Sequence, residues 1–98
     1  MIPENRIPTH PGVVLLEEFL LPLGITQVEL AKHLQVSVQR INEIVNGKRG
    51  ITPATAWLLA EAFESTPEFW LNLQANRDLA LNRPTNSRAP LKKAAGQA

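Results

Sequence analysis

The sequence predicts an all-α domain of five helices, and three observations support this prediction. Four residues that favour helix N-caps, at positions 26, 37, 52 and 66, each precede a helix-forming segment, and a fifth segment follows His10. Apolar side chains recur within these segments at helical spacing. The 98 residues suffice for one domain with a modest core. We expect a compact domain over residues 10–82, between a flexible arm (1–9) and a disordered basic tail (83–98).

The first helix is expected to run from about residue 11 to residue 21. Pro22 and Gly24 follow and should end it. Glu17 and Glu18 are expected to lie largely outside. The inner stripe of this helix is predicted to consist of Val13, Leu16, Phe19 and Leu20.

The next stretch, TQVELAKHLQVSVQRINEIVN (26–46), predicts two short helices joined by a tight turn. Thr26 and Glu29 have the spacing of a capping box before a helix over residues 27–34. A second helix starts after Ser37, which leaves only Gln35 and Val36 as the connection, so the helices must cross steeply. Gln35 stands where such turns usually have glycine. It must therefore adopt a left-handed conformation at a cost of about 1 kcal/mol, or the turn has another shape.

The second helix of this pair has one apolar side and one polar side. On a helical wheel, Ile41, Ile44 and Val45 face the core. Asn and Gln can bond adenine bidentately, Arg suits guanine or phosphate, and Val38 suits a thymine methyl. The opposite, exposed side is predicted to carry Val38, Gln39, Asn42, Glu43 and Asn46, with Arg40 at its flank.

A basic loop, Asn46-Gly47-Lys48-Arg49-Gly50, follows this helix and suits the phosphate backbone of DNA. The arrangement predicts a helix-turn-helix that places its second helix in a DNA groove. The alternative is a helical hairpin in a bundle, with Arg40 and Glu43 paired on a solvated face. The capping, the two-residue turn and the basic loop together favour DNA binding.

Two further helices start at Thr52-Pro53 and Thr66-Pro67. In the first, Ala56, Leu59, Ala60 and Phe63 form one apolar arc. The last helix, to about residue 82, has apolar residues in two groups, although a surface helix needs only one. The second group is a candidate subunit interface with Trp70 or Trp57 as anchor, unless both tryptophans belong to the core. The predicted dimer contacts are Trp70, Leu71, Ala75 and Leu79.

The charges are unevenly distributed along the chain. Residues 26–50 hold four bases and two acids, whereas residues 1–25 and 51–82 are net negative and the tail carries four bases. A chain with this distribution is expected to bind DNA in one orientation and as a dimer, rather than to attract nucleic acid generally.

Composition also excludes several classes of function. Without cysteine there are no disulfides or thiolate metal sites, and the chain suits a reducing cytoplasm. No apolar run approaches the length of a membrane span, and no signal peptide is recognisable. The two histidines, His10 and His33, are not grouped with carboxylates, so we expect no metal, no cofactor and no enzymatic activity.

Three motifs now stand together: the HPG opening at residues 10–12, the NGKRGIT loop at 46–52 and the TPEFWLNLQ segment at 66–74. With them, residues 10–79 resemble the HigA family of antitoxins, also called virulence-associated protein I. The resemblance implies a fold similar to phage (lambda) repressors and a homodimer that binds an inverted-repeat operator upstream of its own operon. It also implies a partner, a small basic toxin of the HigB/RelE type that cleaves messenger RNA on the ribosome.

The resemblance further implies a role for each side chain of the motif. Base contacts would come from Val38, Gln39, Asn42 and Glu43. Phosphate contacts would come from Gln27, Ser37, Arg40, Asn46, Lys48 and Arg49. Two positions depart from the family pattern: Gln35 replaces the usual glycine, and Leu58 stands where arginine is frequent.

Two alternatives to an antitoxin remain. A free-standing repressor, derived from a phage or regulating metabolism, would bind DNA in the same way without a toxin. A protein–protein adaptor would not bind an operator at all. If a basic toxin binds, we expect it on the acidic helices, near Glu17 and Glu18 or near Glu61 and Glu64.

Overall fold

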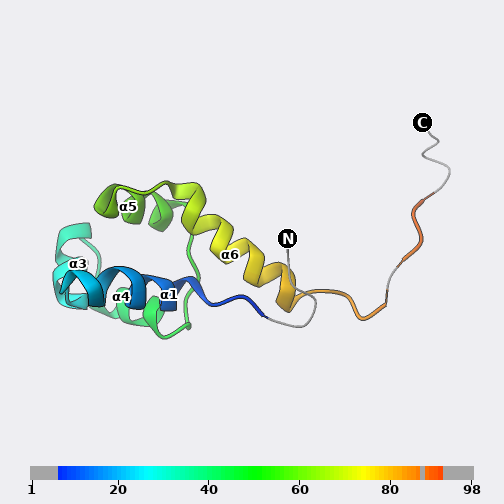
Figure 1. The fold of residues 1–98 in the computed structure, drawn as a ribbon, viewed down its shortest axis with the longest axis horizontal. Helices are drawn as coiled ribbons and strands as arrows, with labels where there is room; N and C mark the ends of the chain where they lie inside the picture. Colours follow the sequence, from blue (N-terminus) through cyan, green and yellow to red (C-terminus); the bar gives the residue numbers. More distant parts are fainter. Residues whose placement is uncertain (1–6, 87, 92–98) are drawn as a thin grey trace.

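The protein is described here by a computed structural model, which covers residues 7–86 and 88–91. This part of the chain has five helical segments and no strand, which confirms the all-α prediction (Figure 1). The first segment consists of α1 (Pro11–Val14), a π-helical turn η1 (Leu15–Leu20) and α2 (Leu21–Leu23). The others are α3 (Gln27–Leu34), α4 (Val38–Val45), α5 (Pro53–Phe63) and α6 (Pro67–Leu81).

The predicted arm and tail lie partly outside the described residues, because 1–6, 87 and 92–98 are not included. Residues 7–9 are not helical, and neither are 83–86 and 88–91. Pro8 nevertheless joins the domain, since its carbonyl oxygen accepts a hydrogen bond from the Arg77 guanidinium at 2.8 Å. None of the described helices is long and apolar enough to cross a lipid bilayer.

The first helical segment differs from the prediction in length and in register. It continues through Pro22 to Leu23, and Gly24 ends it in the left-handed conformation with φ 69°. The Leu21 N–H donates to the Leu16 carbonyl, five residues back, as in a π-helix. We attribute the wide turn to Pro22, whose ring would clash with the carbonyl four residues earlier in an α-helix.

This wider turn changes which side chains of the first segment face the core. Leu15 and Leu20, five residues apart, are both fully buried. The predicted stripe omitted Leu15 and included Val13, which is only half-buried and not part of the core, whereas the predicted Leu16 and Phe19 do pack against the core. The helical wheel was wrong at these positions because it assumed 3.6 residues per turn throughout.

The other helices begin where their capping residues predict. The Thr26 hydroxyl accepts from the Glu29 N–H at 3.0 Å, and the Glu29 carboxylate accepts from the Thr26 N–H at 2.8 Å. This confirms the capping box. Ser37, Thr52 and Thr66 each accept one backbone N–H three residues ahead, at 3.1 to 3.3 Å. Each cap satisfies a donor that the first helical turn leaves free.

Trp70 occupies the centre of the core and not the surface. Its side chain is 0% exposed, and its indole N–H donates to the Ser65 hydroxyl at 3.0 Å. The ring lies 5.1 Å from the Phe19 ring between centroids. The prediction that Trp70 forms part of a dimer interface is therefore wrong, because its apolar area is already buried within the subunit. Trp57, the other tryptophan, is 59% exposed.

A close helix contact explains the glycine at position 12. A Cβ atom on Gly12 would lie only 1.7 Å from the carbonyl oxygen of Ile44, near the end of α4. The first helix thus approaches α4 backbone to backbone, which only glycine allows. This contact supports α4 from behind, so that its other side is left for solvent.

Candidate nucleic-acid interface

The turn between α3 and α4 has the left-handed geometry at Gln35, the first of the two shapes that the sequence allowed. This residue has φ 60° and ψ 43°. The Val36 N–H donates to the Ala31 carbonyl at 3.0 Å, and the Gln35 N–H donates to the Lys32 carbonyl at 3.2 Å. These bonds close the C-terminus of α3. Only Ser37, the N-cap of α4, then separates Val36 from the start of α4. The relative orientation of the two helices is thereby fixed by backbone bonds.

The two sides of α4 separate as the wheel predicted. Ile41, Ile44 and Val45 are buried. Val38 is 46% exposed, and the other residues predicted to contact bases are exposed or half-buried. Figure 1 shows α3 and α4 beside one another at one end of the domain. A row of polar side chains on a firmly supported helix is therefore open to a partner.

Amide groups form a chain across this row. The Asn42 amide N–H donates to the Gln27 side-chain oxygen at 3.2 Å, which links α4 to the start of α3. The Asn42 oxygen accepts from the Asn46 amide at 3.0 Å. An asparagine amide has two N–H groups and two acceptor lone pairs. Asn42 therefore retains one N–H donor and one acceptor lone pair, and adenine in the major groove requires one group of each kind.

A second group of side chains surrounds Glu43. Its carboxylate accepts from the Arg49 guanidinium at 2.8 Å and from the Gln39 amide at 3.3 Å. Glu43 was predicted to contact a base and Arg49 to contact a phosphate, but in the free protein they pair with one another. The pair neutralises a carboxylate that would otherwise repel phosphates, and it ties the basic loop to the recognition surface.

Arg40 makes a contact that the sequence did not predict. Its guanidinium donates to the hydroxyl of Thr55 at 2.7 Å. Thr55 is buried at the start of α5 and is also bonded to Thr52. This bond connects α4 to α5 and leaves other guanidinium N–H groups for a phosphate. No local pattern indicates it, because the two partners are fifteen residues apart.

The basic loop is held at both of its ends. Gly47 has a left-handed backbone conformation with φ 76°, and the Lys48 N–H donates to the Glu43 carbonyl at 2.8 Å. At the far end, Gln74 of α6 accepts from the Ile51 N–H at 2.7 Å. The Lys48 side chain remains exposed. Gln74 was also missed by the sequence analysis, since only the fold brings α6 to the loop.

His10 lies behind this loop. It is 8% exposed, and its Nδ1 accepts from the Gly12 N–H at 2.8 Å. Burial lowers the pKa of His10 below its usual value, and the positive charge of Arg77 lowers it further, although Asp78 acts in the opposite direction. The neutral imidazole is thus the form that caps the first helix. In the described part of the chain, no three His, Asp or Glu residues are grouped as a metal site would require.

Comparison with known proteins gives a consistent result. A protein-family model described as helix-turn-helix matches residues 16–71. Virulence-associated protein I of Dichelobacter nodosus is 47% identical over 79 residues, which cover 80% of this chain and 73% of the relative.

Two solved structures are similar over most of their length. One is a Pseudomonas aeruginosa protein in complex with its operator DNA, with TM-score 0.80 and 37% identity, covering 86% of this chain and 97% of the other. The second is the Pseudomonas aeruginosa antitoxin HigA with the higBA promoter. Its TM-score is 0.74 and its identity 36%, and the match covers 91% of this chain and 87% of that one.

Proposed function

Because this chain belongs to the helix-turn-helix family, among the HigA antitoxins and virulence-associated proteins, we propose that it represses its own operon by binding operator DNA. The observation that carries the proposal is the exposed α4 surface, where Asn42 presents an oriented donor and acceptor. Two structurally similar proteins have been solved with operator or promoter DNA. The same surface here has the chemistry to read bases.

We assign the side chains to two roles. Base edges in the major groove are contacted by Val38, Gln39, Asn42 and Glu43. Phosphates on either side are contacted by Gln27, Ser37, Arg40, Asn46, Lys48 and Arg49. For Arg49 to reach a phosphate while Glu43 meets a base, their ion pair must open or shift on the DNA.

The protein acts as a two-fold dimer in this proposal. On α6, Ala75 and Leu79 are exposed, Leu79 to 58%, and Leu71 is half-buried at the edge of the core. A dimer through this face presents two α4 helices to successive major grooves about 34 Å apart, on an inverted-repeat operator. Leu79→Glu should convert the dimer to a monomer in sedimentation equilibrium, and Leu91→Glu, an exposed position outside α6, is the control.

A small basic toxin that cleaves messenger RNA is the proposed protein partner. Support comes from membership among HigA antitoxins and from the exposed carboxylates of Glu18, Glu61 and Glu64. The test is footprinting of the DNA just upstream of the gene, with and without the protein encoded next to it. Protection of an inverted repeat supports the repressor, and co-purification of a small basic neighbour supports the antitoxin. Protection without co-purification would instead identify a free-standing repressor.

A further inference from the structure

A groove separates the C-terminal end of the first helix from the C-terminal end of α5. It has a volume of ≈ 480 Å³, and none of the residues proposed to contact DNA lines it. Its floor is apolar and includes Phe19 and Phe63, whose ring centroids are 5.0 Å apart. Its rim carries the carboxylates Glu18, Glu61 and Glu64. All three glutamates are exposed.

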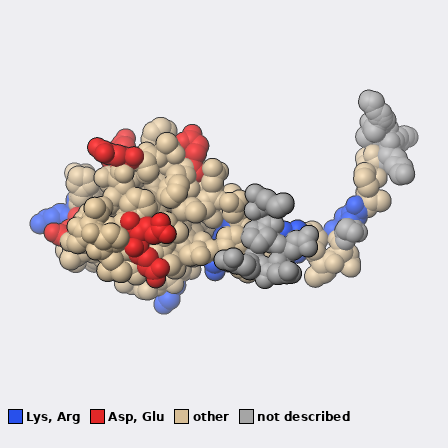
Figure 2. Space-filling model, viewed as in Figure 1, with Lys and Arg blue, Asp and Glu red and all other residues tan. Residues whose placement is uncertain are grey.

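These rim carboxylates are not neutralised within the described part of the chain. The ion pair found there joins Arg49 to Glu43, at the DNA-reading surface. No lysine or arginine lines the groove. Figure 2 shows Asp and Glu atoms at the top and centre of the face that it presents, with Lys and Arg atoms towards the edges. An apolar floor between like charges strengthens their negative potential, because field lines spread less through the protein than through water.

The apolar surface continues beyond Phe63. A second hollow of ≈ 310 Å³ shares Ala62 and Phe63 with the first, and it is also lined by Leu30 of α3. Glu29 stands at its edge. Together the two hollows form a strip of apolar surface, with the three rim glutamates along the first hollow and Glu29 and His33 beside the second. An amphipathic helix docks on such a strip through apolar residues spaced three and four apart.

We propose that this groove binds a basic amphipathic helix of a partner protein. Its apolar residues contact Phe19 and Phe63, and its lysine or arginine side chains face the three rim glutamates. The negative charge of the rim glutamates favours a basic partner protein over DNA or a second copy of this chain. DNA would be repelled by the carboxylates. The proposed α6 dimer face of a second copy, Leu71, Ala75 and Leu79, offers no cation to complement the rim.

The groove and the DNA-reading surface share no residue. A partner in the groove therefore does not compete for the side chains that are proposed to contact DNA. Identification of this partner as the toxin rests on the proposed function, whereas the chemistry of the groove does not.

The test uses a defined peptide and the full chain. The probe is a fluorescent helical peptide of about 18 residues, roughly 27 Å long, with leucines on one face and lysines on the other. The reference probe has the same composition with the pattern scrambled. Fluorescence anisotropy at physiological salt should show about tenfold tighter binding of the amphipathic peptide, because only it offers a continuous apolar face.

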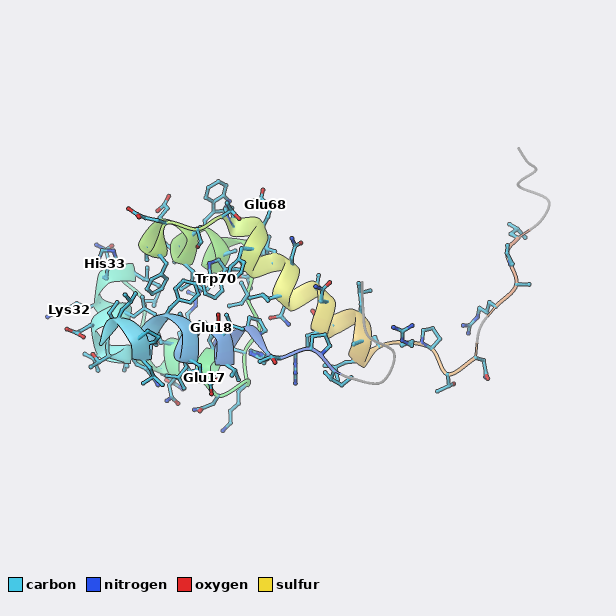
Figure 3. All side chains as sticks on the ribbon, viewed as in Figure 1. Glu17, Glu18, Lys32, His33, Glu68 and Trp70 are labelled. Atoms are coloured by element: carbon cyan, nitrogen blue, oxygen red, sulfur yellow. The ribbon has the colours of Figure 1, made fainter. Side chains whose placement is uncertain are left out.

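Charge reversal locates the binding site. Glu18→Lys and Glu61→Lys should each weaken the amphipathic peptide about fivefold, since each replaces an attraction by a repulsion. Glu17→Lys is the matched control, because Glu17 is the exposed neighbour of Glu18 but does not line the groove (Figure 3). It should change affinity less than about twofold. Unchanged operator binding by all three variants verifies their folding.

Two results would overturn the inference. One is equal weakening by Glu17→Lys, and the other is equal affinity for the scrambled peptide, since either indicates only general charge attraction. The neighbouring gene product separates this inference from the antitoxin proposal. If that protein binds wild type and the Glu18→Lys and Glu61→Lys variants equally, the groove is not the docking site although the antitoxin function stands. If no protein binds but the peptide results hold, the antitoxin proposal fails and the groove remains.

Discussion

Single side chains determine what the proposed interface can read, and Asn42 is the best placed of them. Its amide is oriented from both ends, by Gln27 and by Asn46. A free asparagine would have to lose rotational freedom when it meets a base. Here the folded protein has already oriented it, so less entropy is lost on binding DNA.

Asn42→Ala should weaken operator binding by about 1 to 3 kcal/mol and relax specificity at one base pair in each half-site. Competition binding against operators with single substitutions measures both effects. Asn76→Ala, which removes an exposed asparagine from α6, should change neither. Equal losses on operator and random DNA would contradict the assignment of Asn42 to a base. Gln27→Ala should weaken binding to every sequence, because it removes a proposed phosphate contact. It should also relax specificity, less than Asn42→Ala does, because it frees one end of the Asn42 amide.

Lys48 should contribute affinity without specificity. Lys48→Ala removes one exposed cation from the basic loop, so binding should weaken on every sequence. The slope of log affinity against log salt concentration should become shallower by about one unit. Lys32, which is exposed on α3 and labelled in Figure 3, provides the control substitution. An unchanged slope for Lys48→Ala would remove it from the phosphate contacts.

At the scale of the element, the turn between α3 and α4 is strained and can be relieved. Gln35 adopts the left-handed conformation that disfavours side chains. The structure shows no side-chain hydrogen bond of Gln35 among the described residues. This turn sets the crossing of the two motif helices, so its geometry matters more than the identity of its side chain.

Gln35→Gly should therefore stabilise the protein by about 0.5 to 1 kcal/mol. Relief of strain contributes about 1 to 2 kcal/mol, and the greater freedom of glycine in the unfolded chain offsets part of it. Thermal unfolding should show a rise of a few degrees, on the order of 4 °C per kcal/mol or more. The matched control, Gln39→Gly within α4, should lower stability by about 0.5 to 1 kcal/mol. A fall in stability with Gln35→Gly would show that its side chain has a role in the fold.

At the scale of the whole molecule, His10 joins parts that are distant in the sequence. It caps the first helix and lies against Gly47 of the basic loop, and the charges of Arg77 and Asp78 on α6 shift its pKa. Protonation would remove the acceptor that Nδ1 offers to the Gly12 N–H. The charge of His10 is therefore coupled to the stability of the entire domain.

The lowered pKa of His10 predicts the sign of the pH dependence. Because the folded state disfavours the imidazolium, the unfolded chain binds the proton first. The stabilisation is complete above the ordinary pKa of about 6.5 and is lost as pH falls through the lowered folded-state pKa. Urea unfolding from pH 7.5 to 5 should show this loss. His10→Asn keeps a capping group and should flatten the curve, whereas His33→Asn should not.

The packing of the whole domain also explains why the assignment of Trp70 to the dimer interface was wrong. The wheel divided the apolar residues of α6 into two groups, but it could not tell which of these residues the core would cover. The structure places Trp70 against Phe19 and beside Ser65, and truncating a core tryptophan costs about 3 to 5 kcal/mol. Such burial depends on the first helix, whose π-helical turn was itself not predicted.

Features that depend on residues within about four positions of one another could be predicted from the amino-acid sequence. These include the four hydroxyl N-caps, the limits of α3 and α4, and the exposed side of α4, whereas the left-handed Gln35 was one of two turn shapes that the sequence left open. Hydrogen bonds at such short range form in the same way whatever packs around them.

The contacts between distant residues could not be predicted and became visible only in the folded protein. Arg40 reaches Thr55, Gln74 holds Ile51, Trp70 fills the core, and two helix ends create the acidic groove. Each of these arrangements arises when elements that are distant in the sequence pack together. That packing depends on the shapes of all the helices at once.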